Sequence, residues 1–280
     1  MKGLRKRHAK DFFMKSIMVC SVTAVLSILI IILLYILING LGTLSFKFIF
    51  SSARDGGIFP MIVTTFYVVL TSLAVALPIG IITAVYLVEY SRNYHRVKYI
   101  RLAIETLAGI PSILYGLFGL LIFSRIMGFG QSIAAGGLTL GIMILPVIIR
   151  TTEESLKTIP QAFREGSLAL GTTQWQTIYR VVLPSAIPGI ITASILAIGR
   201  VVGEAAPVLL TVGIARNMPT SIFQSGRTLT IHLYYLTKEA INPNDFEIAF
   251  ATAAVLVLFV ILVNTATRFI TIGFKKRMEQ

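Results

Sequence analysis

The sequence has one cysteine, one tryptophan and few charged residues. Only 13% of its 280 residues are charged, against about a quarter in soluble proteins. Because Cys20 is alone and lies in an apolar run, an internal disulfide is excluded and no redox or metal site is indicated. The three histidines are far apart, and no H-E-x-x-H motif is present. No Gly-Lys pair occurs, which excludes a Walker-type phosphate loop, and no nucleophile–base–acid set is visible. We therefore expect neither an enzyme nor a cofactor.

Long uncharged runs are present instead, and several reach the ~20 residues that a helix needs to cross a bilayer. They predict an all-α integral membrane protein with six transmembrane helices. The transmembrane region covers residues 16–274, with spans at about 16–38, 58–88, 106–124, 132–149, 181–214 and 248–268. A basic N-terminal segment, 1–15, precedes it and a basic tail, 275–280, follows it. The run 16–38 is too long for the core of a signal peptide and lacks a cleavage site, so it is predicted to be a retained first span.

A net charge of +13 is compatible with nucleic-acid binding, but the positions of the basic residues indicate a membrane topology instead. With six spans, 18 of the 25 basic residues fall on the side of the two termini, six fall on the other side, and Arg200 lies within a span. Basic residues mark the cytoplasmic side of a membrane protein. The sequence therefore predicts a multi-pass protein of the cell membrane, in contact with lipid, with both termini in the cytoplasm and no nucleic-acid partner.

A polar break at residues 153–184 lies on the same predicted cytoplasmic side. It contains two candidate helix starts, Thr158–Gln161 and Thr173–Gln176, and each has the form of a capping box. Gly171 lies between them, where a chain leaving a helix commonly needs a left-handed residue. The break is predicted to be a loop of two short helices joined by a bend.

The same stretch resembles the EAA loop of ABC-importer permeases. Glu165 begins the motif, and Gly171 follows at the family's spacing. Nine residues and the pair Val181-Val182 then separate Gly171 from Leu183-Pro184, which end the motif. Gly-Ser replaces Ala-Ala after the glutamate, and Val replaces Ile before the Leu-Pro pair. The resemblance implies that Glu165, Gly171, Leu183 and Pro184 belong to a coupling loop that docks on separate ATPase subunits. An ordinary amphipathic loop is the alternative.

The span 181–214 carries two charges inside an apolar segment, Arg200 and Glu204, four residues apart and expected on one helix face. Gly199 and Gly203 have a G-x-x-x-G spacing, which favours close helix packing. Pro207 cannot bond back to Gly203, so an irregular helix is expected where the charges lie. Irregular backbone at membrane depth is tolerated where it is buried in protein or lines water. Arg200 and Glu204 are therefore candidates for a substrate path, and a structural ion pair is the alternative.

This segment resembles the G-R-x-x-G-E-T-A-P signature of phosphate permeases, with Ala205 where the family often has Thr. The stretch Gly109-Ile110-Pro111-Ser112 resembles a second motif of that family and predicts a kinked, tightly packed helix; a direct pore-lining role stays open. The resemblance runs from about residue 56 to 264 and favours the A-type subunit. It implies a C-type second permease subunit, ATPase subunits and an extracytoplasmic phosphate-binding protein as partners.

Two other functions stay open on the sequence. One is the permease of an importer for a different oxyanion, since an arginine does not distinguish phosphate from sulfate or molybdate. The other is a stand-alone channel, carrier or membrane enzyme, which would leave the spacing from Glu165 to Pro184 unexplained. The long segment 211–247 between the last two spans could dock a binding protein or be a solvated connector.

Overall fold

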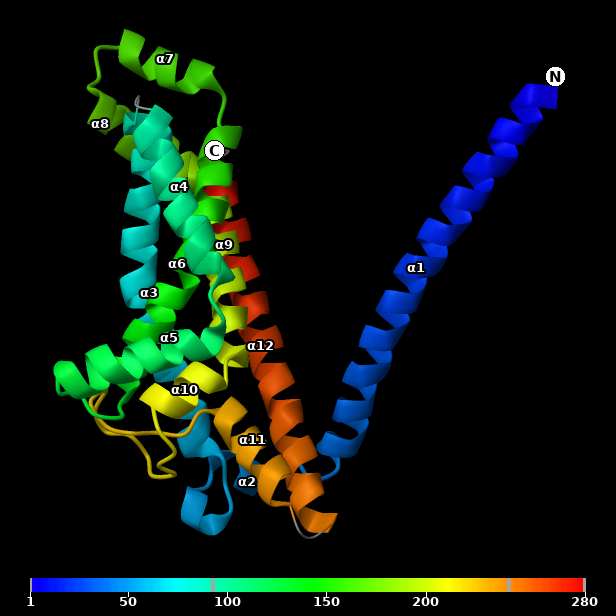
Figure 1. The fold of residues 1–280 in the computed structure, drawn as a ribbon, viewed down its shortest axis with the longest axis vertical. Helices are drawn as coiled ribbons and strands as arrows, with labels where there is room; N and C mark the ends of the chain where they lie inside the picture. The colour runs from blue at the N-terminus through cyan, green and yellow to red at the C-terminus, as the bar shows by residue number, and fades with distance from the viewer. Residues whose placement is uncertain (1, 92–93, 241–242, 279–280) are drawn as a thin grey trace.

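The computed structural model describes residues 2–91, 94–240 and 243–278, and within them every regular element is helical. Arg92 and the outermost residues of the two predicted terminal segments (1, 279 and 280) lie outside the described part. Figure 1 shows the arrangement of the helices. The long ones are α1 (Lys2–Leu41), α3 (Phe59–Val85), α6 (Ile133–Thr158), α9 (Leu183–Gly203) and α12 (Pro243–Met278). The predicted all-α membrane fold is confirmed: five helices are long and apolar enough to cross a membrane, or six if one bent pair counts as a span.

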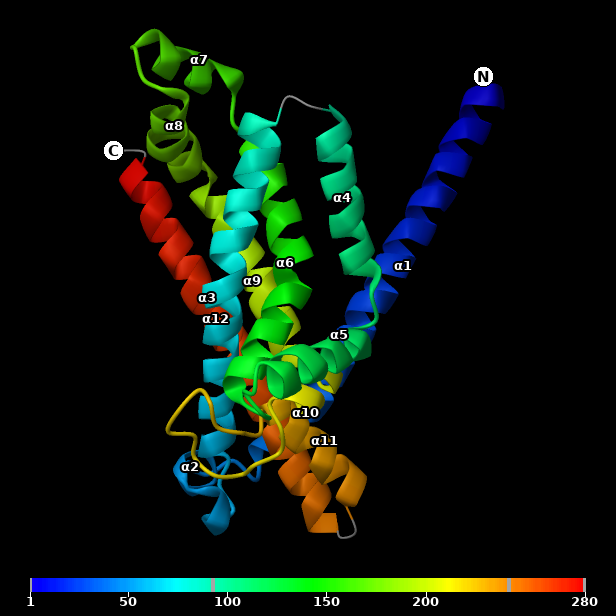
Figure 2. The ribbon, with the colours of Figure 1, turned by 60° about the vertical axis from the view of Figure 1, so that its left-hand side comes forward.

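The bent pair corrects the predicted span 106–124. Helix α4 (Tyr94–Gly109) is followed by α5 (Ser112–Gly119) and the π-helical segment η3 (Leu120–Ile126), and the two parts meet at 97°. In Figure 2, α4 runs along the bundle while α5 lies across it. The cause is Pro111, the N-cap of α5, which has extended backbone (ψ 137°) and lacks the N–H that would continue the helix. The segment 106–124 is therefore a corner and not one kinked helix.

The predicted span 181–214 is also interrupted. A π-helical segment, η4 (Ile178–Val182), precedes α9, and α9 ends at Gly203. Glu204 is extended (ψ 129°), and a short helix, α10 (Ala206–Thr211), begins with Pro207 in its first turn. Glu204 is therefore the C-cap of α9. The expectation that Arg200 and Glu204 lie on one helix face is wrong for Glu204.

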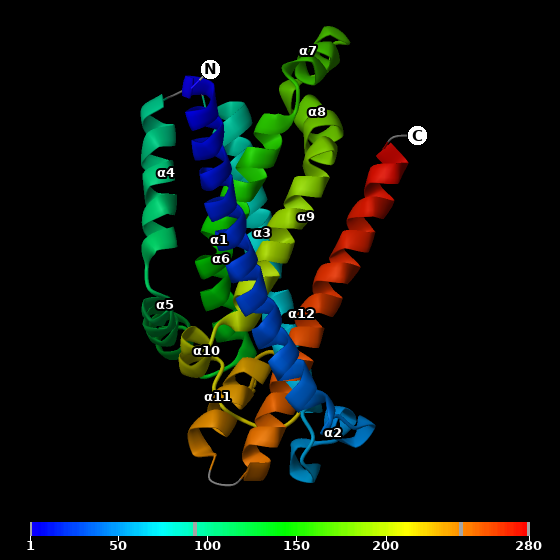
Figure 3. The ribbon, with the colours of Figure 1, turned by 90° about the vertical axis from the view of Figure 1, so that its right-hand side faces the viewer.

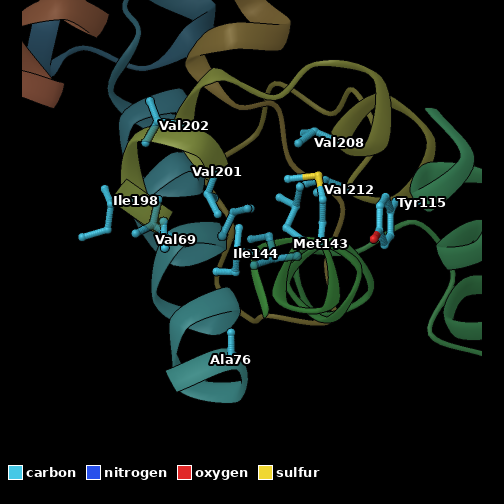
Figure 4. Packing of buried hydrophobic residues seen from close by; sticks show 14 of the residues in the cluster. Val69, Ala76, Tyr115, Met143, Ile144, Ile198, Val201, Val202, Val208 and Val212 are labelled. Atoms are coloured by element: carbon cyan, nitrogen blue, oxygen red, sulfur yellow. The ribbon is translucent and has the colours of Figure 1, made fainter. Parts of the chain in front are cut away.

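The core forms where α3, α6 and α9 meet, and α10 closes it (Figure 4). Ala76 of α3, Met143 and Ile144 of α6, and Val201 and Val202 of α9 are all buried in one apolar cluster. Close approach of α3 and α6 depends on glycine, because a Cβ at Gly80 would lie 2.6 Å from Ile148 Cγ2.

The connecting helices gather at the two ends of the bundle. The loop helices α7 (Gln161–Ala169) and α8 (Gln174–Thr177) lie at the same end as the start of α1 and the end of α12 (Figure 1). The opposite end holds α2 (Phe46–Phe50), the 3₁₀ turn η1 (Ala53–Asp55) and α11 (Leu229–Glu239). The start of α1, the end of α12 and the predicted coupling loop thus lie at one end of the bundle.

Helix α1 diverges from the bundle in Figure 1 and passes in front of it in Figure 3. It meets α12 near its far end, where the rings of Tyr35 and Phe250 lie 5.6 Å apart and Gly40 lies against the Phe250 backbone. No residue of its most apolar stretch is buried within this chain. An apolar stretch that is exposed in this way is left facing lipid or another chain.

Candidate functional site

The middle of the predicted loop 153–184 has the expected form, with the short helices α7 and α8 joined by a bend, whereas its two ends belong to the long helices α6 and α9. Gly171 lies at the bend with φ +84°, a left-handed conformation that disfavours residues with a Cβ. Thr173 and Gln176 form the expected capping box at the start of α8. The predicted box at Thr158 is wrong, because α6 continues through Thr158, whose hydroxyl donates to the Ser155 carbonyl, and Pro160 is the N-cap of α7.

Three hydroxyls join the two loop helices. Ser167 of α7, Thr172 of the bend and Thr177 of α8 lie 2.8–3.0 Å from one another, and Thr172 also donates to the Ser167 carbonyl. Thr177 is buried. Hydrogen bonds among these hydroxyls fix the angle between α7 and α8, so the pair behaves as one piece.

Arg164 attaches this piece to the transmembrane helices. Its Nε donates to both oxygens of Glu89, at 3.1 and 3.2 Å, and its Nη2 donates to Oε1 at 2.7 Å. The remaining donors reach the carbonyls of Leu156 and Ile159 at the end of α6. Glu89 belongs to η2 (Tyr86–Tyr90), the π-helical end of α3, and only 9% of its side chain is exposed. The sequence did not reveal this pair, since its members are 75 residues apart.

The outer surface of the loop is apolar and exposed. Leu170 is 87% exposed and Trp175 61%, and Glu165 is exposed as well. Glu165 forms no ion pair with any residue in the described ranges. Leu183 and Pro184 lie at the start of α9, half-buried, where the loop joins the span. The loop thus leaves several large side chains exposed.

Arg200 and Glu204 lie at the break between α9 and α10. Arg200 Nε is 3.8 Å from Glu204 Oε1, and 33% and 18% of the two side chains are exposed. The distance is too long for a hydrogen bond, so the two charges are paired only loosely. Helix α5 covers the break, since a Cβ at Gly116 would lie 2.8 Å from Pro207 Cα. Thr230 of α11 donates to the Val202 carbonyl from the other side.

The glycines that were predicted to allow close helix packing make no close contact within the described part of the chain. A Cβ at Gly109, Gly199 or Gly203 would meet nothing within 4 Å in the described part of the chain. Close contacts are made by other glycines: Gly80, Gly116, Gly119, Gly136, Gly137 and Gly189. The space beside Gly199 and Gly203 therefore stays open next to Arg200, and their role in packing against another chain remains a prediction.

Two further charged groups were not singled out from the sequence. Between α4 and α6, Glu153 accepts from Arg101 at 2.5 Å and from Lys157 at 2.6 Å, beside a cavity of about 360 Å³. At the other end of the bundle, Arg227 is buried, donates to the Ile214 carbonyl and lies over the Tyr235 ring. Nearby His232 is buried as well. Burial, and then Arg227 and Arg216, lower the pKa of His232 to about 4.

A family model described as the binding-protein-dependent transport system inner membrane component matches residues 76–280. The chain belongs to this family. It is therefore a permease subunit of an ABC importer, a multi-pass integral membrane component that is not itself catalytic. Membership implies an ATPase and an extracytoplasmic binding protein as its partners.

Relatives and solved structures agree with the assignment. The chain is 38% identical over 268 residues to the probable ABC transporter permease protein YqgI of Bacillus subtilis, covering 89% of this chain and 91% of the relative. It is 36% identical over 234 residues to the phosphate transport system permease protein PstA 1 of Mycobacterium tuberculosis (strain H37Rv), covering 83% and 75%.

Two solved structures share the fold. Inward-facing MetNI, a methionine ABC transporter, matches with a TM-score of 0.62 at 23% identity, covering 82% of this chain and 99% of that one. A bacterial alginate ABC transporter matches with a TM-score of 0.68 at 15% identity, covering 95% and 97%. At these identities the likeness concerns the fold alone.

Proposed function

We propose that this importer carries phosphate and that the chain forms half of its translocation path. Relatives named as phosphate permeases and the Gly199–Pro207 signature support the substrate. The observation that carries the proposal is the loose ion pair of Arg200 and Glu204 at a break in a transmembrane helix. A charge inside a span carries an insertion cost, roughly 2.5–3.5 kcal/mol at the centre and less towards the interface, so two such charges favour a function or a firm partner.

The position of Arg200 suits a path through the membrane. It lies 17 residues after Leu183, which at ~1.5 Å per residue is ~25 Å along α9, beyond the midplane of a ~30 Å core. A guanidinium offers paired donors to a phosphate oxygen pair. Glu204 would neutralise Arg200 when the path is empty and weaken its hold on the passing anion, which allows release.

The other assignments complete the transporter. The loop with Glu165, Gly171, Leu183 and Pro184 docks on the ATPase from the cytoplasm and couples ATP hydrolysis to transport. Helix α1 and the open space at Gly199 and Gly203 face a second permease subunit, of the C-type. The segment between α10 and α12 faces a phosphate-binding protein outside the membrane.

Uptake of radioactive phosphate by the reconstituted complex tests the proposal, with sulfate and molybdate as competitors. We expect phosphate alone to be transported, Arg200→Gln to reduce uptake at least tenfold, and Arg200→Lys to retain part of it, because the charge remains but the paired donors do not. Assembly is measured in parallel by copurification of the ATPase.

The outcomes separate the two roles of Arg200. If the pair is structural, Arg200→Gln abolishes assembly and the charge-matched Arg200→Gln/Glu204→Gln restores it. Normal uptake by Arg200→Gln contradicts the path outright. Uptake of sulfate or molybdate in place of phosphate keeps the path and replaces the substrate.

A further inference from the structure

Glu89 is the point at which both halves of the coupling loop attach to the transmembrane bundle. We propose that Glu89, held by Arg164, is a positioning residue that transmits the movement of the loop to helix α3. The inference rests on the proposed coupling role of the loop and adds to it the residue pair through which the force passes.

The two attachments come from different loop helices. Arg164 of α7 binds the Glu89 carboxylate through three hydrogen bonds, and Gln174 of α8 donates its side-chain amide to the Glu89 carbonyl at 2.7 Å. Since the hydroxyls of Ser167, Thr172 and Thr177 fix α7 against α8, a rigid piece is held at two points by one residue. Such a piece cannot rotate about a single bond to Glu89.

The Arg164–Glu89 ion pair is buried and directional. Only 13% of the Arg164 side chain and 9% of the Glu89 side chain are exposed. Two-point binding of a carboxylate by a planar guanidinium is directional, whereas apolar contacts slide. The remaining donors of Arg164 hold the carbonyls of Leu156 and Ile159, so α3, α6 and α7 meet at this one side chain.

A cavity of about 750 Å³ lies under the loop, lined by Glu89, Arg164, Leu168 and Gln174 among others. The loop is therefore not packed solidly on the spans beside this pair. Its apolar support comes through Ile159, Ile178 and Val182, in a cluster with Val85 and Leu87. The polar pair is the directional contact between the loop and α3.

From Glu89 the connection continues through packed helices. Helix α3 packs on α6 at Gly80 and Ile148. Helices α3 and α6 share one apolar cluster with Val201 and Val202, which are adjacent to Arg200 in α9. A displacement of the end of α3 can thus reach the charged break through close-packed side chains.

The first test uses spin labels and needs no substrate. In a Cys20→Ser background, labels at Leu170→Cys on the loop and Ile82→Cys on α3 occupy exposed positions, 87% and 68%. In the purified complex we expect one narrow distance distribution that ATP does not change, because loop and α3 move together. With Glu89→Gln we expect a broader distribution that shifts with ATP.

The second test measures coupling, as phosphate transported per ATP hydrolysed by the reconstituted complex. We expect Glu89→Gln to keep the ATPase bound and to lower this ratio several-fold, and the exchange Glu89→Arg/Arg164→Glu to recover part of it. Glu154→Gln is the matched control, because its pair with Arg150 is exposed and 3.7 Å long and should leave the ratio unchanged.

A purely structural pair would reduce the yield of complex without changing the distance distribution or the ratio, and that result overturns the inference. Unchanged label distances in Glu89→Gln overturn it as well. If the wild-type complex binds the ATPase but does not move phosphate, the proposed substrate fails instead, and the label distances still decide the role of Glu89. If it contains no ATPase, the coupling role of the loop and this inference fail together.

Discussion

His232 and Arg227 show how burial acts on single charged residues at the end of the bundle opposite the coupling loop. Arg227 Nη1 and His232 Nδ1 are buried and find no hydrogen-bond partner among the described residues. Removing an ionised group from water is costly, and a histidine can avoid the cost by staying neutral. The field of Arg227 and Arg216 acts in the same direction. His232 is therefore a neutral side chain at neutral pH.

We predict that the transporter subunit loses stability as the pH falls from about 6.5 towards 4. The pKa of His232 is lowered to about 4 in the folded chain, so in this window the unfolded chain binds the proton more readily. The full loss is about 3 kcal/mol, from a shift of roughly two to three units. Unfolding midpoints in detergent between pH 7 and 4.5 measure it.

The matched comparison is between two histidine variants. His232→Gln should flatten this pH dependence, whereas His95→Gln, at an exposed position, should leave it as in the wild type. Equal slopes for the wild type and His232→Gln would show that another group is responsible.

At the scale of elements, the sequence predicts those features of the helices that depend on residues close together in the chain. The bend at Gly171 and the box at Thr173 depend on residues three to five apart, and both were predictable. The corner at Pro111 was expected only as a kink, because the angle depends on what α5 packs against. Glu89 and Arg164 are 75 residues apart, so only the folded chain brings them together.

Glycine packing was the less predictable part, since spacing alone pointed to Gly199 and Gly203 and the contacts of α3 with α6 use others. We predict that Gly137→Ala destabilises the bundle by about 1–3 kcal/mol, the usual cost of overpacking. The new Cβ would lie 2.6 Å from Thr71 Cβ, and both residues are on packed helices. Thermal unfolding in detergent measures the change.

Gly166→Ala is the control, because it adds the same methyl group to a helix where nothing lies within 4 Å. Replacing a helical glycine with alanine in open space should be neutral or stabilising by about 0.5–1 kcal/mol. If both variants unfold at the same temperature, the close approach of α3 and α6 is not rigid.

At the scale of the whole molecule, the two ends of the bundle differ in their content of basic residues, as the predicted topology requires. The end with α7 and α8 also holds the start of α1 and the end of α12, where the basic residues concentrate. The end with α2 and α11 holds few. The proposed docking faces for an ATPase and for a binding protein are therefore at opposite ends of the bundle.

We predict that the α7–α8 end faces the cytoplasm, because 18 of the 25 basic residues fall on its side and such residues are retained there. Single cysteines in a Cys20→Ser background test this with a membrane-impermeant maleimide. Phe223→Cys, at a 57% exposed position of the other end, should react in intact cells, and Leu170→Cys, at an 87% exposed position of the bend, should react only after the membrane is opened. The reverse pattern would place the loop outside, where no ATP is supplied, and would contradict its coupling role together with the orientation.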